Sequence, residues 1–187
     1  MIGYLGSINK IDNFNGNINI VQNVSDNIDS IGFWLTSDIN SSKPFAIGTE
    51  KIFKKSNTEF WDDGEPKVVQ VEHPVQGFIY KIYIDEPILK NYGSTTEDSY
   101  NLFMIERDEY CDYFSAKKRN LTWKDDAILL NKEEANTAFR NTLVRQGYDG
   151  FLLPNCKLQS GVTDFFCMFS NENFHIADII PIDDLDK

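Results

Sequence analysis

The feature that most constrains the fold is a period-two pattern in the middle of the chain. Between positions 78 and 84, every even position is a large apolar or aromatic residue, and the odd positions hold Ile79, Lys81 and Tyr83. Side chains of a strand alternate between its two faces, so this segment predicts a β-strand. The segment from Val68 to Glu72 has the same composition, and a break at His73-Pro74 predicts two separate strands of one sheet.

Other segments predict further strands and a few helices. Strand composition occurs in a short opening segment, in Phe33–Thr36 after Gly32, and later at 151–153, 165–169 and 176–182, with 154–161 as a loop. Ser41-Ser42-Lys43-Pro44 resembles a helix start with a hydroxyl cap, which puts Phe45 in the first turns. Apolar spacing predicts helices over 96–114, where an aromatic stripe fits a core, and from Asn131 to Gly147.

These elements predict one α+β domain over residues 1–187. The 187-residue chain has 41% apolar residues, and a chain of this size buries about 70% of the surface that its unfolded form exposes. It contains no internal repeat and no Pro/Ser-rich linker that would divide it.

Charge and composition restrict the partners. Eighteen basic against 29 acidic residues give a net charge of −11, which opposes binding to nucleic acid or to an anionic membrane and favours a protein with a basic surface or a small molecule.

No segment approaches the roughly 18 apolar residues of a membrane span, and no Sec-type signal is expected. Three widely spaced cysteines predict a reducing cytoplasm, either the cell's own or that of a target cell. His73 and His175 lack metal-ligand spacing, so no metal is expected.

Common catalytic motifs are absent, but several short segments occur in an informative order. The sequence has no Walker loop, no His-Glu-x-x-His, no Gly-x-Ser-x-Gly and no Gly-x-Gly-x-x-Gly. It does have Gly3-Tyr4-Leu5-Gly6-Ser7, then Gly32-Phe33-Trp34-Leu35-Thr36 with Phe45 eleven positions after Trp34, and later Gly147-Tyr148-Asp149-Gly150-Phe151 and Thr163-Asp164-Phe165-Phe166.

In this order, with the two middle strands between them, these segments resemble the ADP-ribosyltransferases of the diphtheria-toxin and poly-ADP-ribose-polymerase type, including bacterial and phage domains. The resemblance runs from residue 2 to about residue 182. It implies an ADP-ribosyltransferase-like split β-sandwich with a few flanking helices. It also implies a mono-ADP-ribosyltransferase, plausible as a phage or bacterial effector, that uses NAD as a substrate and modifies a protein target.

The resemblance assigns roles to individual residues. The backbone of Gly6 would bind the nicotinamide carboxamide, and Trp34 and Phe45 would stack on the two faces of its ring. Ser7 and Thr36 would support the site through their hydroxyls. Asp164 would be the catalytic carboxylate, because cleavage of the nicotinamide–ribose bond passes through an oxocarbenium-like ribose that a carboxylate stabilises. Glu172 is the alternative carboxylate, although its surroundings favour a turn.

Simpler interpretations of the same residues remain. Phe45 is equally compatible with the core, and the hydroxyls of Ser7 and Thr36 suit plain turn or strand roles. The family's ribose-binding His is replaced by Leu5, for which Tyr4 is a substitute donor, and its Glu by the shorter Asp164. These replacements leave a second hypothesis, an inactive binding or inhibitor protein of the same fold, and a third, an unrelated α+β interaction protein.

Overall fold

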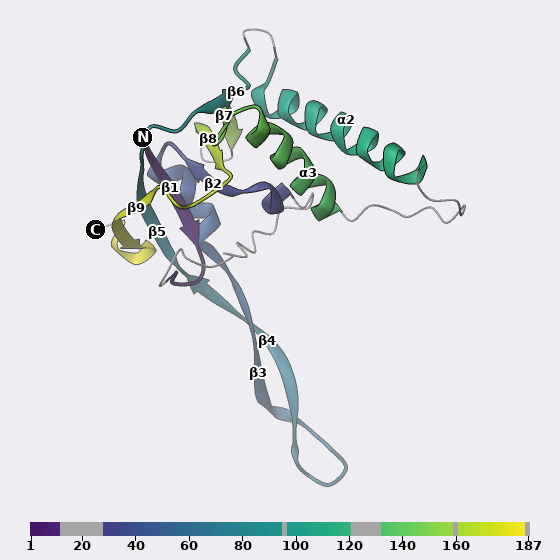
Figure 1. Cartoon of the computed structure of the whole chain (residues 1–187). Helices are drawn as coiled ribbons and strands as arrows, with labels where there is room; N and C mark the ends of the chain where they lie inside the picture. The colour runs from purple at the N-terminus through teal and green to yellow at the C-terminus, as the bar shows by residue number, and fades with distance from the viewer. Residues whose placement is uncertain (12–27, 95–96, 121–131, 159–160, 186–187) are drawn as a thin grey trace.

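A curled seven-stranded sheet forms the body of the protein (Figure 1). The structure is a computed structural model that describes residues 1–11, 28–94, 97–120, 132–158 and 161–185. The strand order is β6-β7-β8-β2-β1-β5-β9, and neighbours are antiparallel except β6 and β7. The strands are β1 (Ile2–Ser7), β2 (Phe33–Thr36), β5 (Phe78–Ile84), β6 (Leu89–Asn91), β7 (Gly150–Leu158), β8 (Gly161–Met168) and β9 (Phe174–Pro181).

The remaining elements are helices and one long hairpin. The α-helices are α1 (Ile39–Ser42), α2 (Ser99–Asn120) and α3 (Lys132–Arg145), and the 3-10 helices are η1 (Ile28–Ile31), η2 (Lys43–Ala46) and η3 (Ile182–Asp184). The hairpin of β3 (Ile47–Phe60) and β4 (Pro66–Gln76) forms a separate two-stranded sheet. The described chain therefore has the α+β class that the sequence predicts.

The sheet bends where β1 meets β2. β1 pairs with β5 over six residues but with β2 only at Tyr4 and Thr36. The bend brings Phe33 of β2 to 5.6 Å from the ring centroid of Phe174 on β9, although two strands lie between them in the sheet order. The two halves of the sheet therefore enclose an apolar core on one face, which contains Leu5, Leu35, Tyr80, Ile82, Ile84, Phe166 and Met168.

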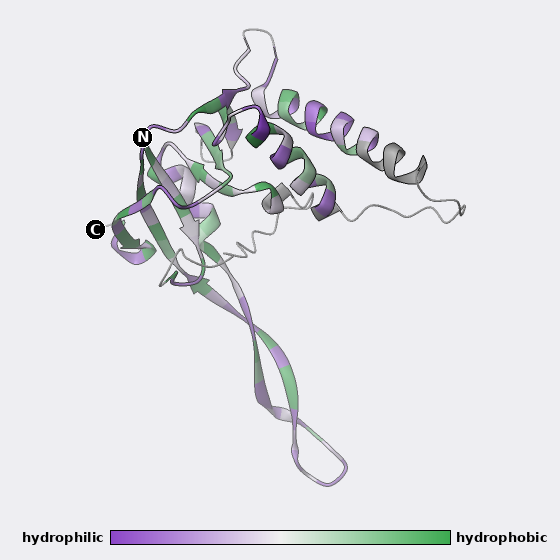
Figure 2. Cartoon of the chain, viewed as in Figure 1, coloured by the Kyte–Doolittle hydropathy of each residue, from purple (hydrophilic) through white to green (hydrophobic). Residues whose placement is uncertain are grey.

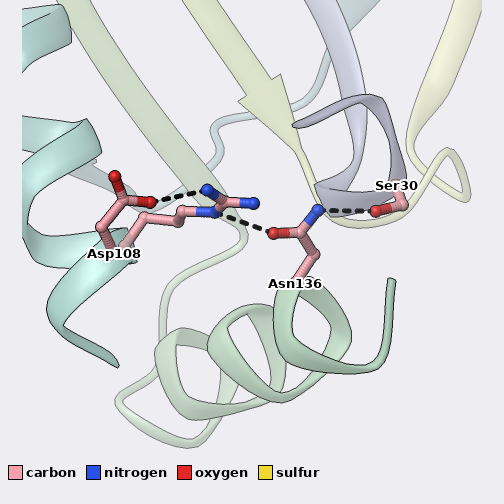
Figure 3. A network of polar contacts seen from close by, with 4 residues as sticks. Ser30, Asp108 and Asn136 are labelled. Atoms are coloured by element: carbon pink, nitrogen blue, oxygen red, sulfur yellow. Dashed lines mark hydrogen bonds and ion pairs between the residues drawn. The ribbon is translucent and has the colours of Figure 1, made fainter. Parts of the chain in front are cut away.

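A second core lies on the opposite face, under α2 and α3. Phe103 of α2 stacks on Phe151 of β7 with the ring centroids 4.8 Å apart, and Phe139 of α3 packs beside them. Polar contacts also join the helices, as Figure 3 shows: Arg107 Nε donates to Asn136 Oδ1 at 3.0 Å, and Asn136 Nδ2 donates to Ser30 Oγ at 2.8 Å. The predicted aromatic stripe of 96–114 is thus confirmed as core at Tyr100, Phe103, Met104 and Tyr110, whereas the side chain of Phe114 lies outside the described residues.

Several predicted boundaries are wrong for identifiable reasons. The strand at 68–72 does not share a sheet with 78–84, because β4 pairs with β3. Nor does Pro74 end β4, since a two-stranded ribbon leaves each strand a free edge where a missing N–H costs nothing. The loop expected at 154–161 is largely strand, because β7 continues past Pro154 through a bulge between Leu153 and Cys156.

Predicted helix ends are partly confirmed. The helix start predicted at Ser41-Ser42-Lys43-Pro44 is confirmed as the 3-10 helix η2, with Ser42 as N-cap, the proline in the first turn and Phe45 within it, but the Ser42 hydroxyl makes no capping hydrogen bond. The preceding α1 is capped by the carboxylate of Asp38, which accepts from Ser41 N at 2.9 Å. Gly147 follows the end of α3 with φ of 89°, as a helix-ending glycine should. The expected caps Thr96 and Asn131 lie outside the described residues.

Candidate active site

Three of the segments singled out in the sequence meet on neighbouring strands. Tyr4 of β1 pairs with Thr36 of β2, and Thr36 pairs with Phe165 of β8. Directly paired residues project to the same face of a sheet, so these three side chains share one face. Phe45 belongs to the same group, because its ring lies 6.1 Å from that of Phe165 in an edge-on arrangement.

Gly6 lies directly beneath the turn that carries Phe45. A Cβ atom at Gly6 would be 2.3 Å from the Ser42 carbonyl oxygen and 2.9 Å from the Phe45 Cβ. Only glycine allows the backbone of the 39–46 segment to approach β1 this closely. The contact joins the first and second motifs and identifies Ser42, which is fully buried, as a neighbour of Gly6 that sequence reasoning missed.

Hydrogen bonds among Thr36, Asp38 and Ser41 hold the 39–46 segment over β1. Asp38 accepts hydrogen bonds from the backbone N and the Oγ of Ser41 at 2.9 and 3.0 Å. Thr36 Oγ1 donates to the Asp38 carbonyl oxygen at 2.8 Å. Thr36 therefore positions the turn that leads to Phe45; whether its hydroxyl supports a ligand site stays a prediction.

Trp34 does not form one wall of an open cleft. Its side chain is 9% exposed and lies in the helix-covered core, with edge-on ring contacts to Phe103, Phe151 and Phe165 at 5.9, 5.4 and 6.5 Å. The expected geometry, with Trp34 and Phe45 as opposed walls one ring apart, is therefore wrong in this structure. Phe165 contacts both rings, so the half-buried aromatic pair beside the turn is Phe45 with Phe165.

Asp164 precedes Phe165 in β8, so its side chain projects to the face opposite that of Phe165. It is half-buried and hydrogen-bonded to the segments on both sides of β8. Its Oδ1 accepts a hydrogen bond from Asn155 N at 2.8 Å, at the bulge of β7 where Asn155 adopts φ of 56°. Its backbone accepts from Ser37 N at 2.9 Å and donates to Ser37 Oγ at 3.2 Å. Within the described residues Oδ2 accepts no hydrogen bond, so one carboxylate oxygen is engaged and one is available for a ligand.

Other expected residues lie in or against the core, or make local contacts. Leu5 is 1% exposed and packs in the core between the two sheet halves, so its position cannot contact a ribose. Tyr4, the proposed substitute donor, shares the face of Thr36 and Phe165 and packs against Ala46, Ile79 and Ile182. Ser7 Oγ donates to the Asn9 carbonyl oxygen at 2.8 Å, a local turn contact.

The alternative carboxylate, Glu172, is not part of this group. It is exposed in the turn after β8, and its backbone N donates to Ser170 Oγ at 3.2 Å. Asp164 lies near the start of β8 and Glu172 beyond its end, so the strand separates the two acids. The turn interpretation of Glu172 is the one that agrees with its place in the fold.

Cys156 follows the bulge next to Asp164 but lacks the character of a nucleophile. Burial raises the pKa of its thiol; Ser99 lowers it, and the Asp98 and Asp164 carboxylates add to the increase. The Sγ lies 3.5 Å from Ser99 Oγ and donates to the Leu153 carbonyl oxygen at 3.5 Å. A buried thiol with a raised pKa is a weak nucleophile at neutral pH.

Sequence reasoning missed Ser37 and Asn155 as neighbours of Asp164 and gave no role to Phe165 of the same motif. Ser37 Oγ is 3.2 Å from Thr163 Oγ1 and joins the end of β2 to β8. The signal for Ser37 and Phe165 was present, since both directly follow residues that the motifs had identified. The contact of Asn155 depends on a bulge that the local sequence does not reveal.

Comparison of the chain with known protein families, with curated proteins and with solved structures gives no match. Among the described residues, no group of three or more His, Cys, Asp or Glu side chains is arranged to hold a metal ion. None of the helices in the described ranges is long and apolar enough to cross a membrane. The case for a function therefore depends on the geometry around Gly6, Phe45 and Asp164.

Proposed function

We propose that the protein is a mono-ADP-ribosyltransferase that transfers ADP-ribose from NAD to a protein target. The observation that carries this proposal is the convergence of separate motifs: residues 3–7, 32–46 and 163–166 occupy neighbouring strands and the turn packed on them. Within this group, Gly6 supports Phe45, and Phe45 contacts Phe165. Asp164 is the chain neighbour of Phe165 and projects from the other face of the same strand. Accidental matches to a family's motifs have no reason to meet in space.

Each group has a chemical part in this proposal. The backbone of Gly6, beside Ser42, is the partner for the nicotinamide carboxamide. Phe45, backed by Phe165, offers an aromatic surface to the nicotinamide ring, and Trp34 supports Phe165 from the core. The finer fold that we propose is the split β-sandwich of this family, for which the bend between β1 and β2 is the supporting feature.

Asp164 has the catalytic role in the proposed reaction. The bond between the nicotinamide nitrogen and the ribose C1′ breaks, and nicotinamide leaves with the bonding electrons. A nucleophilic side chain of the target forms the new bond to C1′ and releases its proton to water. Positive charge develops on the ribose in between, and the free oxygen of the Asp164 carboxylate stabilises it. The hydrogen bond from Asn155 holds this carboxylate in one orientation before substrate binds.

The charge of the chain favours a target with a basic surface. A net charge of −11 attracts such a protein and repels a phosphate backbone, so protein modification fits better than nucleic-acid modification. Free cysteines at positions 111, 156 and 167 suit a reducing cytoplasm, either the cell's own or that of a cell into which the protein is delivered.

A second candidate function is an inactive binding module of the same fold. The buried Leu5 favours it, because the position at which the resembling family binds ribose is closed by the core here. Both candidates predict NAD binding at the same face, but only the first predicts bond cleavage.

The experiment incubates the pure protein with NAD labelled in its adenine moiety, together with a lysate of the organism from which the gene comes. Label on a protein other than the chain itself supports the transferase. Binding of NAD without transfer or nicotinamide release supports the binding module. If the protein neither binds NAD nor transfers label, both proposals are wrong.

A further inference from the structure

The β3–β4 hairpin, residues 47–76, projects away from the body as an arm (Figure 1). Its two strands pair with each other and with no other described strand. An isolated two-stranded hairpin is marginally stable in water, and this one is 14 residues long on the β3 side. An arm of this length therefore needs a partner to stabilise it.

The arm exposes large apolar side chains on both of its faces, and Figure 2 shows hydrophobic residues along its length. Phe53 is 72% exposed and Val68 is 60% exposed, and the register puts them on one face because Phe53 opposes Gln70 and Lys55 opposes Val68. Ile47, Phe60, Trp61 and Val71 are exposed as well. Exposed apolar groups gathered on one element mark an interaction surface.

Charge is divided along the arm. The shaft, residues 47–58 and 66–76, has four lysines and two glutamates, whereas the tip, residues 59–65, has four acidic residues and no basic one. Two such arms placed side by side in opposite directions bring the acidic tip of each beside the basic shaft of the other. This arrangement has twofold symmetry, the commonest symmetry of protein dimers.

The free edge of β3 is the better edge for such pairing. It contains no proline from Ile47 to Phe60, whereas β4 carries Pro66 and Pro74, which cannot donate a backbone hydrogen bond. The pairing of β3 with β4 is regular from Ile47 to Lys55, and an irregularity follows between Lys55 and Phe60. A free edge without proline can add a further strand. A foreign acidic strand would neutralise the shaft but leave the acidic tip unpaired.

We infer that the occupant of the arm is the arm of a second copy of this chain, paired antiparallel through β3. This inference is independent of the proposed reaction, since it uses no residue of the candidate active site. It commits to a dimer in which Phe53 packs beside cross-strand side chains of the second β3, and the lysines at positions 54 and 55 lie beside the tip of the other copy.

The test is a charge exchange between two variants, read by sedimentation velocity or by light scattering over a concentration series. The shaft variant is Lys54→Glu with Lys55→Glu, and the tip variant is Glu59→Lys with Asp62→Lys and Glu65→Lys. These shaft lysines oppose valines across the hairpin, so their reversal breaks no pair within the arm. Each variant alone has like charges on shaft and tip, whereas an equimolar mixture restores both attractions.

The wild type is expected to be a dimer, each variant alone a monomer, and the mixture a heterodimer. Phe53→Glu should also give a monomer, whereas Tyr113→Glu, at a 67% exposed position on α2, should leave the dimer intact. A wild type that stays monomeric into the high-micromolar range would overturn the inference, as would dimers that persist in all of the arm variants.

Discussion

One carboxylate oxygen of Asp164 accepts a hydrogen bond from the backbone of β7, and the other is available to a ligand. Its place before an apolar strand made it a candidate from the sequence, and the structure puts it beside Ser37 at the end of β2. Its hydrogen bond from Asn155 was not predictable, because that contact depends on a bulge formed by long-range pairing. A substitution there must therefore separate a structural loss from a chemical one.

Asp164→Asn should lower turnover on NAD by on the order of a hundredfold or more, with little change in NAD affinity, because the charge acts mainly in the transition state. Asparagine keeps an oxygen that accepts from Asn155 N, so the melting temperature should stay close to that of the wild type. Initial rates of nicotinamide release measure the effect, with the exposed Asp178→Asn as the matched control. A wild-type rate in Asp164→Asn would rule out this residue as the catalytic carboxylate.

Trp34 should respond to truncation as a residue of the core does. Trp34→Ala removes a buried indole from the aromatic core and should cost about 3–5 kcal/mol in the free energy of unfolding. Tyr113→Ala, at an exposed position, should stay within about 0.5 kcal/mol of the wild type. Urea unfolding followed by fluorescence and circular dichroism measures both, and a loss below about 1 kcal/mol for Trp34→Ala would contradict its assignment to the core.

At the scale of elements, the sequence pattern reveals strands and helices that have one buried face. The alternation at 78–84 correctly predicts β5, and the apolar spacing that ends at Gly147 correctly predicts α3. β3 has no such pattern, because almost all of its residues are exposed and neither of its faces is covered by the body. A strand without a buried face has no reason to alternate in polarity, so local sequence could not show it.

The turn of α1 and η2 on β1 depends on Gly6. Gly6→Ala would place a methyl group against the Ser42 carbonyl oxygen, and backbone must move to relieve the contact. Overpacking of this kind costs roughly 1–3 kcal/mol, and here it would also displace Phe45. Chemical denaturation should show this loss for Gly6→Ala, whereas Ser7→Ala should be nearly neutral; equal stabilities would mean that the turn does not rest on β1.

At the scale of the whole molecule, the bent sheet brings the motif segments onto neighbouring strands. The order β8-β2-β1 collects segments that are more than 100 residues apart in the sequence, and the turn before the arm completes the group. The family resemblance implies that these segments form one site, and the structure places them on neighbouring strands; their function stays a prediction. The resemblance did not predict that Trp34 would lie in the core, because the helices that cover it pack through contacts made far along the chain.

The most direct test of the account is a calorimetric titration of the protein with NAD. The wild type is predicted to bind NAD at a single site, and Phe45→Ala to bind at least about tenfold more weakly, the equivalent of about 1.4 kcal/mol of lost contact with the ring. Phe53→Ala, which removes an exposed phenylalanine from the arm, should bind as the wild type does. Absence of NAD binding by the folded wild type, or equal affinity in Phe45→Ala, would contradict a nicotinamide site at the turn over Gly6.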